Sequence, residues 1–300
     1  MKIAKRVFLF ILTNLLVVAT ISVVLSLFGV QPYLSQKGIN FGSLIIFCAI
    51  WGFGGAFISL ALSRVMAKWM MGVKVVKEDE TDPQLRSLVQ RVHDLSIRAG
   101  LEKMPEVGVY ESPELNAFAT GPSKNRSLVA VSTGLLQGMS RQEVEGVLAH
   151  EIAHIVNGDM VTMTLVQGVV NSFVMFLARV AGFFAGQLVD EEKRPMVQLF
   201  ASIALEIVLG ILGMMVVAYV SRRREYRADR GGADLSSRGH MIAALERLKV
   251  NYHTGNTEMN DRAGAIASLQ ISGRKGGLIR LFSTHPDLDD RINRLRANPL

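Results

Sequence analysis

The stretch His150-Glu151-Ile152-Ala153-His154 decides how the fold and chemistry of this chain are interpreted. Residues four apart share one face of a helix, so His150 and His154 can direct two imidazole nitrogens at one metal ion. Glu151 would then project beside the coordination position that such a pair leaves open, where a carboxylate can accept a proton from water. The pentapeptide therefore predicts a helix with two ligands of a catalytic zinc ion and a general base.

The residues around the pentapeptide favour the helix that this site needs. Ser140 and Glu143 have the spacing of a capping box, which begins a helix. Asn157-Gly158 is a typical C-terminal stop. The apolar positions between these signals recur at helical spacing: Val144, Val147, Leu148 and Ile155. We therefore expect one helix of about four to five turns.

Four apolar stretches are long enough to cross a membrane. Apolar residues make up 49% of the chain, and a span needs about 20 helical residues for a hydrocarbon core about 30 Å thick. The first stretch follows Lys2, Lys5 and Arg6 but is too long for the apolar region of a signal peptide, so we interpret it as a retained span. The predicted spans are Val7–Val30, Ile39–Ser63, Val161–Val189 and Val197–Val220.

The spans divide the chain into two hairpins and two polar segments. We predict transmembrane hairpins at 1–63 and 161–220, and soluble parts at 64–160 and 221–300. The first soluble part shows an amphipathic helix pattern, then short strands, then the metal helix, which favours an α+β arrangement. The expected fold class is an α+β membrane protein with four transmembrane helices and one soluble domain of helices with a small sheet. Both soluble parts would share its core.

The net charge of +7 is arranged around the predicted spans. Basic residues lie before the first span and at Arg222–Arg224 after the fourth, whereas the short loop Gln31–Gly38 has only Lys37. This asymmetry follows the positive-inside rule and predicts that both termini and both soluble parts are cytoplasmic. It favours a lipid bilayer over nucleic acid as the partner of the positive charge. The single cysteine, Cys48, gives no sign of an oxidising compartment.

The third and fourth spans each contain an unexpected charge, Arg179 and Glu206. Each residue lies about 13 Å from its membrane edge at 1.5 Å per residue, close to the midplane. An isolated charge at that depth costs about 2.5–3.5 kcal/mol on insertion scales. We therefore predict that the two side chains pair within the hairpin.

Two histidines do not complete a catalytic zinc site, which needs a third protein ligand. No histidine lies six residues beyond His154, so the candidates are the remaining histidines and the carboxylates. Glu225 and Asp229 are four apart and share a helix face, so they could supply a ligand oxygen and an acceptor for the free N–H of a ligand histidine. On spacing alone, Glu225 could equally be a solvated counter-charge at the basic end of a membrane helix. The other histidines considered are His93, His240, His253 and His285.

The order of the motifs resembles that of the HtpX-type membrane zinc metallopeptidases, relatives of the CAAX prenyl proteases. The resemblance covers nearly the whole chain, including the hairpin inserted between the zinc motif and Glu225. The motifs that carry it are Asn116–Thr120, His150–His154, Glu225–Asp229 and Ser283-Thr284-His285-Pro286.

This resemblance implies a gluzincin-like domain in which His150, His154 and Glu225 hold one zinc ion. It also implies that Glu151 is the base and that Asp229 supports the ligands. The activity implied is that of a zinc endopeptidase of the bacterial inner membrane. Such an enzyme would cleave misfolded or abnormal membrane proteins on the cytoplasmic side, in protein quality control and the stress response.

The roles of His285 and of the strand Asn116–Thr120 each have an alternative interpretation. By resemblance, His285 is a candidate donor to the developing oxyanion, and the alternative is that it caps the helix that follows. A short strand with small side chains could pair with an extended substrate by β-augmentation, and the alternative is an ordinary strand within the sheet. The residues of this strand are Asn116, Ala117, Phe118, Ala119 and Thr120.

Two other classes of function fit the sequence less well. A membrane scaffold or holdase with a structural zinc ion would need neither a base nor an open coordination position, so Glu151 argues against it. A transporter or channel would be expected to show an inverted repeat, and the sequence shows none. A zinc peptidase acting on membrane proteins is therefore the favoured function.

Overall fold

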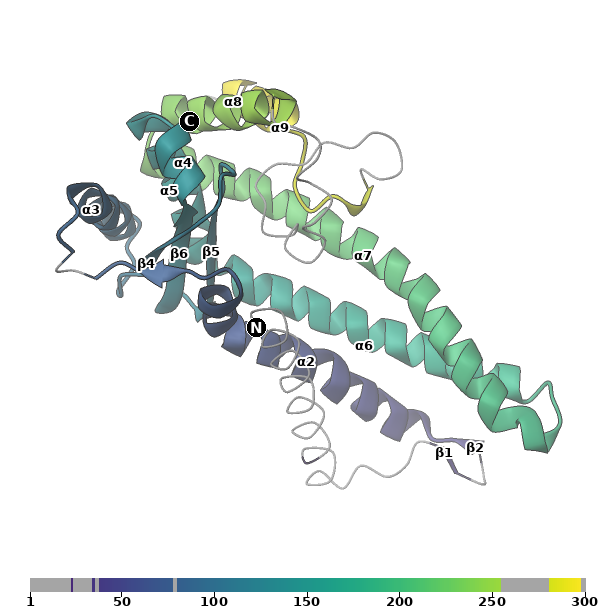
Figure 1. Cartoon of the computed structure of the whole chain (residues 1–300). Helices are drawn as coiled ribbons and strands as arrows, with labels where there is room; N and C mark the ends of the chain where they lie inside the picture. Colours follow the sequence, from purple (N-terminus) through teal and green to yellow (C-terminus); the bar gives the residue numbers. More distant parts are fainter. Residues whose placement is uncertain (1–22, 24–33, 36–37, 78–79, 255–280, 298–300) are drawn as a thin grey trace. The chain divides into compact units, whose positions relative to one another are not determined.

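The computed structural model describes residues 23, 34–35, 38–77, 80–254 and 281–297. The chain is mostly helical with a small mixed sheet (Figure 1). It divides into two compact units, Met1–Leu60 with Met163–Val217 and Ala61–Thr162 with Ala218–Leu300. The predicted first span, Val7–Val30, lies almost entirely outside the described residues, so the prediction of four spans stays a prediction.

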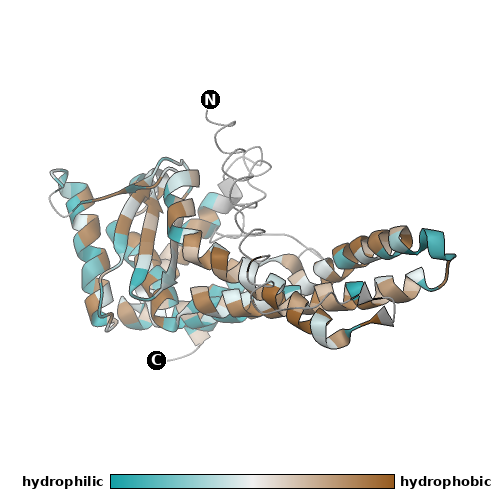
Figure 2. Cartoon of the chain, turned by 90° about the horizontal axis from the view of Figure 1, so that it is seen from below, coloured by the Kyte–Doolittle hydropathy of each residue, from teal (hydrophilic) through white to brown (hydrophobic). Residues whose placement is uncertain are grey.

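Three described helices are long and apolar enough to cross a membrane. Figure 2 colours most of their length as hydrophobic. They correspond to the second, third and fourth predicted spans. A short hairpin, β1 (Leu34–Ser35) with β2 (Gly38–Ile39), precedes the first of them. The helices are α2 (Phe41–Met70), α6 (Asp159–Gly186) and α7 (Arg194–Leu235), with the 3-10 turn η1 (Glu191–Lys193) before α7.

Helix α7 continues 15 residues past the predicted end of the fourth span at Val220. The predicted end of the span lies where hydropathy falls. The helix itself continues, because the residues that follow contain no helix-breaking proline. The continuation places Glu225 and Asp229 on one helix, as their spacing predicted.

The predicted pair of charges within the second hairpin is confirmed. Arg179 Nη1 on α6 lies 3.9 Å from Glu206 Oε2 on α7. The Arg179 guanidinium also lies 5.7 Å from the centroid of the Phe47 ring on α2. Close helix packing occurs nearby, because a Cβ on Gly182 would lie 2.0 Å from Ser202 Oγ. The charges are thus placed where neighbouring helices partly cover them.

The second unit contains a four-stranded sheet in the order β3-β4-β6-β5. Strands β4 and β6 are parallel, and the other neighbours are antiparallel. Because β5 and β6 form a hairpin, β6 lies between β4 and β5, and β5 becomes an edge of the described sheet. The strands are β3 (Lys74–Val75), β4 (Glu106–Tyr110), β5 (Ala117–Ser123) and β6 (Arg126–Ser132).

Five of the described helices lie wholly within this unit, and their apolar faces pack with the sheet into a core. Helix α5 contacts both β5 and β6 and also packs on α8. Core residues from α5 and β6 such as Leu148, Ile152 and Val129 are fully buried. The helices are α3 (Pro83–Arg98), α4 (Thr133–Gly138), α5 (Arg141–Asn157), α8 (Arg238–Thr254) and α9 (Leu288–Ala297).

Candidate active site

The metal-motif helix forms as the sequence predicted. Ser140 Oγ accepts a hydrogen bond from the Glu143 amide, and the Glu143 carboxylate accepts one from the Ser140 amide at 2.6 Å, so the capping box is complete. The helix α5 ends at Gly158, whose φ of 67° is the left-handed conformation that glycine adopts readily. The helix is therefore fixed at both ends by local sequence.

Three predicted ligand atoms meet at one point. His150 Nε2 lies 3.1 Å from His154 Nε2, and the two carboxylate oxygens of Glu225 lie 3.4 Å from these two nitrogens. Ligands about 2.0–2.1 Å from a tetrahedral zinc ion are separated by about 3.3 Å, so the observed separations fit such an ion. Hydrogen bonds alone would serve the cluster poorly, since two imidazole nitrogens point at each other and only one proton fits between them. The residues present thus suit a metal ion.

A carboxylate lies behind each ligand histidine. Asp229 Oδ1 is 3.0 Å from His150 Nδ1, and Asp159 Oδ2 is 2.6 Å from His154 Nδ1. An ionised carboxylate at Nδ1 keeps the proton on that nitrogen and leaves Nε2 as a lone-pair donor for a metal. The sequence predicted the position of Asp229 but missed Asp159. The signal for Asp159 was an acidic residue directly after the helix stop at Gly158.

Arg291 from α9 forms an ion pair with Asp229, and this role of Arg291 was not predicted from the sequence. Its Nε and Nη2 atoms donate to the two oxygens of Asp229 at 2.8 and 2.6 Å, and its side chain is 0% exposed. Its Nη1 lies 3.9 Å from Glu225 Oε2. A signal was available, because Arg291 interrupts the apolar positions of its helix between Leu288 and Ile292.

Every buried charged side chain among the described residues belongs to this site. The four buried carboxylates are Glu151, Asp159, Glu225 and Asp229, and the buried cation is Arg291. Two further arginines approach from more exposed positions on α7: Arg224 donates to Glu225 at 3.0 Å and Arg227 to Asp159 at 2.5 Å.

The pKa values show the sign of the local potential. Burial alone would raise the pKa of Asp229, but the Arg291 guanidinium overrides it and holds the pKa at about 2. Burial likewise opposes ionisation of Glu225, yet the histidines His285 and His154 hold its pKa well below the usual range. Burial would lower the pKa of His150, but Asp229 and Glu225 raise it to about 9. The carboxylates stay ionised, and the space between them attracts positive charge.

His285 is brought to the same cluster. Its Nδ1 lies 2.9 Å from Glu225 Oε2, and both of its ring nitrogens are buried without a hydrogen-bond partner among the described residues. Arg222 holds the preceding segment by donating to the Ser283 carbonyl at 2.8 Å. The first turn of α9 is capped by Asp287, which accepts from the Asp289 amide at 2.9 Å. The side-chain cap seen on α9 is therefore Asp287, and the role of His285 stays a prediction.

The predicted substrate strand lies beside the metal helix. Strand β5 pairs with β6 at the edge of the described sheet and contacts α5, so both interpretations, a substrate strand and an ordinary strand of the sheet, stay open. Ala117 and Phe118 are buried, whereas Ala119 and Thr120 are half-buried. Asn116 precedes the strand and is buried, and its backbone N–H donates to Ser132 Oγ at 3.1 Å. The position suits substrate pairing, which stays a prediction.

A pair of glycines lets α7 approach the metal helix. A Cβ on Gly231 would lie 2.9 Å from the Ala153 Cβ, and one on Gly232 would lie 3.1 Å from the His150 backbone nitrogen. Side chains there would push α7 away from α5. The ligand from α7 can therefore reach the two ligands from α5 because these positions have no side chain.

Comparison with known proteins agrees with this geometry. The model of peptidase family M48 matches residues 79–298. The "Protease HtpX homolog" proteins of Bacillus velezensis and Bacillus subtilis are each 55% identical, over 98% of this chain and 99% of theirs. "Protease HtpX" of Shewanella loihica is 48% identical over the same shares. These identities confirm the resemblance drawn from the motifs.

A solved structure shares the fold. The crystal structure of S. mikatae Ste24p superposes with a TM-score of 0.67 at 16% sequence identity, over 98% of this chain and 65% of that one. The chain thus spans about two thirds of the length of that structure. On the family match and the identities to the HtpX proteases, the chain belongs to peptidase family M48 and is a membrane metallopeptidase.

Proposed function

We propose that the protein is a zinc-dependent endopeptidase of the bacterial inner membrane that cleaves misfolded or abnormal membrane proteins on the cytoplasmic side. The observation that carries this proposal is the triangle of His150, His154 and Glu225, with separations of 3.1–3.4 Å beside the buried Glu151. A structural zinc site would have no use for such a carboxylate next to three ligands. Membership of the chain in family M48 and its similarity to HtpX proteases support misfolded or abnormal membrane proteins as the proposed substrates.

The residues divide the chemistry between them. A zinc ion held by His150, His154 and Glu225 would supply Lewis acidity toward a carbonyl oxygen and lower the pKa of water. Glu151 accepts the proton of the attacking water and delivers it to the leaving amine nitrogen. His285, whose Nδ1 lies 2.9 Å from Glu225 Oε2, would donate to the oxyanion from Nε2 when both of its ring nitrogens carry a proton.

Strand β5 binds the substrate in this proposal. An extended polypeptide adds to the edge that β5 forms in the described sheet through main-chain hydrogen bonds, and the small side chain of Ala119 leaves room for varied substrate side chains. Recognition by backbone suits an enzyme whose substrates share an unfolded state rather than a sequence.

The protease test uses the full-length protein in detergent with casein as the substrate. We expect cleavage with zinc, none with a chelator, and none for Glu151→Gln, although this variant should retain its zinc because the three ligands remain. The matched control is Glu145→Gln, on the same helix but paired with Arg98 at 3.4 Å, which should cleave like the wild type. Cleavage by Glu151→Gln at the wild-type rate would refute the assigned mechanism.

The orientation is tested separately. We propose that the soluble parts 64–160 and 221–300 form the cytoplasmic protease domain, with the hairpins 1–63 and 161–220 in the membrane. Cysteines replacing Gln36 and Glu192, in a background with Cys48→Ser, should react with an impermeant reagent on intact spheroplasts. A cysteine replacing Thr120 should react only after lysis. Labelling of that cysteine alone on intact cells would invert the orientation.

A further inference from the structure

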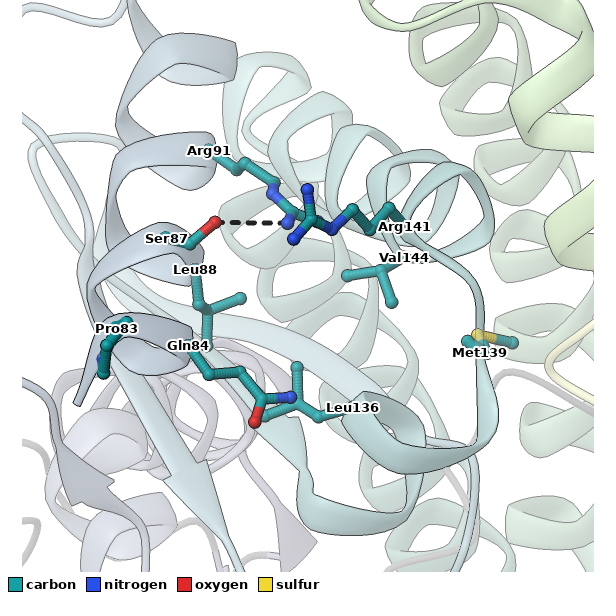
Figure 3. Close-up of a pocket in the computed structure, with 9 residues that line it drawn as sticks. All are labelled: Pro83, Gln84, Ser87, Leu88, Arg91, Leu136, Met139, Arg141 and Val144. Carbon is teal, nitrogen blue, oxygen red and sulfur yellow. Dashed lines mark hydrogen bonds between the residues drawn. The ribbon is translucent and has the colours of Figure 1, made fainter.

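A cavity on the second unit lies apart from the residues of the active site. It has a volume of about 390 Å³ and lies between α3, α4 and the first turns of α5 (Figure 3). Its apolar lining comes from all three helices: Leu88, Leu136 and Val144. Two arginines, Arg91 and Arg141, line the same cavity. The combination of apolar lining and two cations is what a ligand with an apolar body and an anionic end requires.

The two guanidinium groups have no carboxylate partner among the described residues. Arg91 donates to the hydroxyl of Ser87 at 3.1 Å, on its own helix. Figure 3 shows the side chains of Arg91 and Arg141 reaching over the same end of the cavity. By contrast, Arg98 on the same helix is paired with Glu145 at 3.4 Å. The positive charge at the cavity is therefore available to an anion.

The start of α5 adds to this positive potential. Arg141 is the first residue of α5, so the cavity lies at the N-terminal end of a 17-residue helix, where the Glu143 carboxylate already offsets part of the positive potential of the helix dipole. The guanidinium groups of Arg91 and Arg141 repel one another until an anion is bound between them. The arrangement favours a ligand that offers one compact negative group, and a carboxylate can accept paired N–H bonds from a guanidinium.

We propose that this cavity binds the free C-terminal carboxylate of a polypeptide whose last residues are apolar. The carboxylate lies between Arg91 and Arg141, and the apolar side chains of the ligand lie on Leu88 and Val144. The amide of Gln84, which lines the same cavity, bonds the ligand's peptide backbone. The volume is at the small end of ligand sites, which span about 300–1,000 Å³. It suits a few residues better than a two-chain lipid.

The test measures binding and not cleavage. The probe is a short fluorescent peptide ending in two leucines with a free carboxylate, and its partner is the same peptide as a C-terminal amide. Both are titrated by anisotropy against the full-length Glu151→Gln protein in a non-ionic detergent, so that the probe survives. We expect the amide to bind about tenfold more weakly, which corresponds to about 1.4 kcal/mol. Because no cleavage is read, failure here would leave the proposed peptidase function untouched.

Substitutions then locate the site. In the same background, Arg91→Gln and Arg141→Gln should each weaken the free peptide about tenfold and leave the amide unchanged. Arg98→Gln makes the same charge change on α3 outside the cavity and should bind normally. Thermal unfolding checks that all three variants are folded, and Arg141→Lys should restore part of the affinity. Equal binding of carboxylate and amide, or normal binding by both cavity variants, would overturn the proposal. Binding of dodecanoate or phosphate at these two arginines, with no binding of the peptide, would also overturn it.

Discussion

Replacing Arg291 with methionine should destabilise the protein and lower its metal content, although Arg291 is no ligand. The guanidinium makes two short bonds to Asp229, and both side chains are buried. Removing one member of a buried pair leaves the other charge uncompensated and costs about 3–5 kcal/mol. Asp229 in turn positions His150, so the loss also reaches the metal ligands.

The pKa of Asp229 gives a second estimate of the magnitude. It falls from the ordinary 3.8 to about 2, and at about 1.4 kcal/mol per pH unit this is about 2.5 kcal/mol. That figure is net of the burial that opposes ionisation, so the loss on removing the guanidinium should exceed it. Because the folded pKa lies below the ordinary value, the stabilisation is present above about pH 4 and is lost as the pH falls toward 2. A measurement at neutral pH therefore reports all of it.

The assay is thermal unfolding in detergent, together with the zinc content of the purified protein. A loss of about 3–5 kcal/mol should lower the Tm by about 6–20 °C at about 2–4 °C per kcal/mol. Arg294→Met is the matched control, because its side chain on the same helix is 57% exposed and its pairing with Asp290 is worth at most about 1 kcal/mol. The double variant Arg291→Met with Asp229→Leu should recover stability but not metal. An Arg291→Met protein with the Tm and the zinc content of the wild type would refute this reasoning.

Four other predictions follow from the same contacts. Glu225→Ala should lose stoichiometric zinc by elemental analysis, and a full zinc content would place the third ligand elsewhere. Gly232→Val should cost about 1–3 kcal/mol and reduce activity by pushing α7 from the metal helix, whereas unchanged unfolding would contradict that close contact. Arg179→Gln and Glu206→Gln should be non-additive in a double-mutant cycle of stability, and strictly additive losses would exclude coupling. Removing zinc with a chelator should lower the Tm, because a ligand present at 100 times its Kd adds about 2.7 kcal/mol to the free energy of unfolding; an unchanged Tm would mean that no metal is bound.

The sequence predicted best what local interactions determine. The capping box at Ser140 and the stop at Gly158 define α5 without help from the rest of the chain. Arg291 and Asp159 could not be placed in the same way, because Arg291 bonds Asp229 across 62 residues and Asp159 accepts from Arg227 across 68 residues. A basic residue among apolar positions of α9 signalled a buried partner, but not which carboxylate it would meet. The end of α7 was missed because hydropathy reports the membrane and not the helix.

The buried charges of the site explain why binding of a metal cation and stability of the fold should be linked. Four carboxylates and one arginine are the buried charged side chains of the described residues, and all five lie in this site. Burying a surplus of negative charge is costly unless positive charge accompanies it. Arg224 and Arg227 supply part of it from more exposed positions, and the raised pKa of His150, about 9, shows that the surplus persists. A divalent cation would relieve this surplus at the point where the predicted ligand atoms converge. Metal binding is therefore expected to stabilise the same contacts that hold α5, α7 and α9 together.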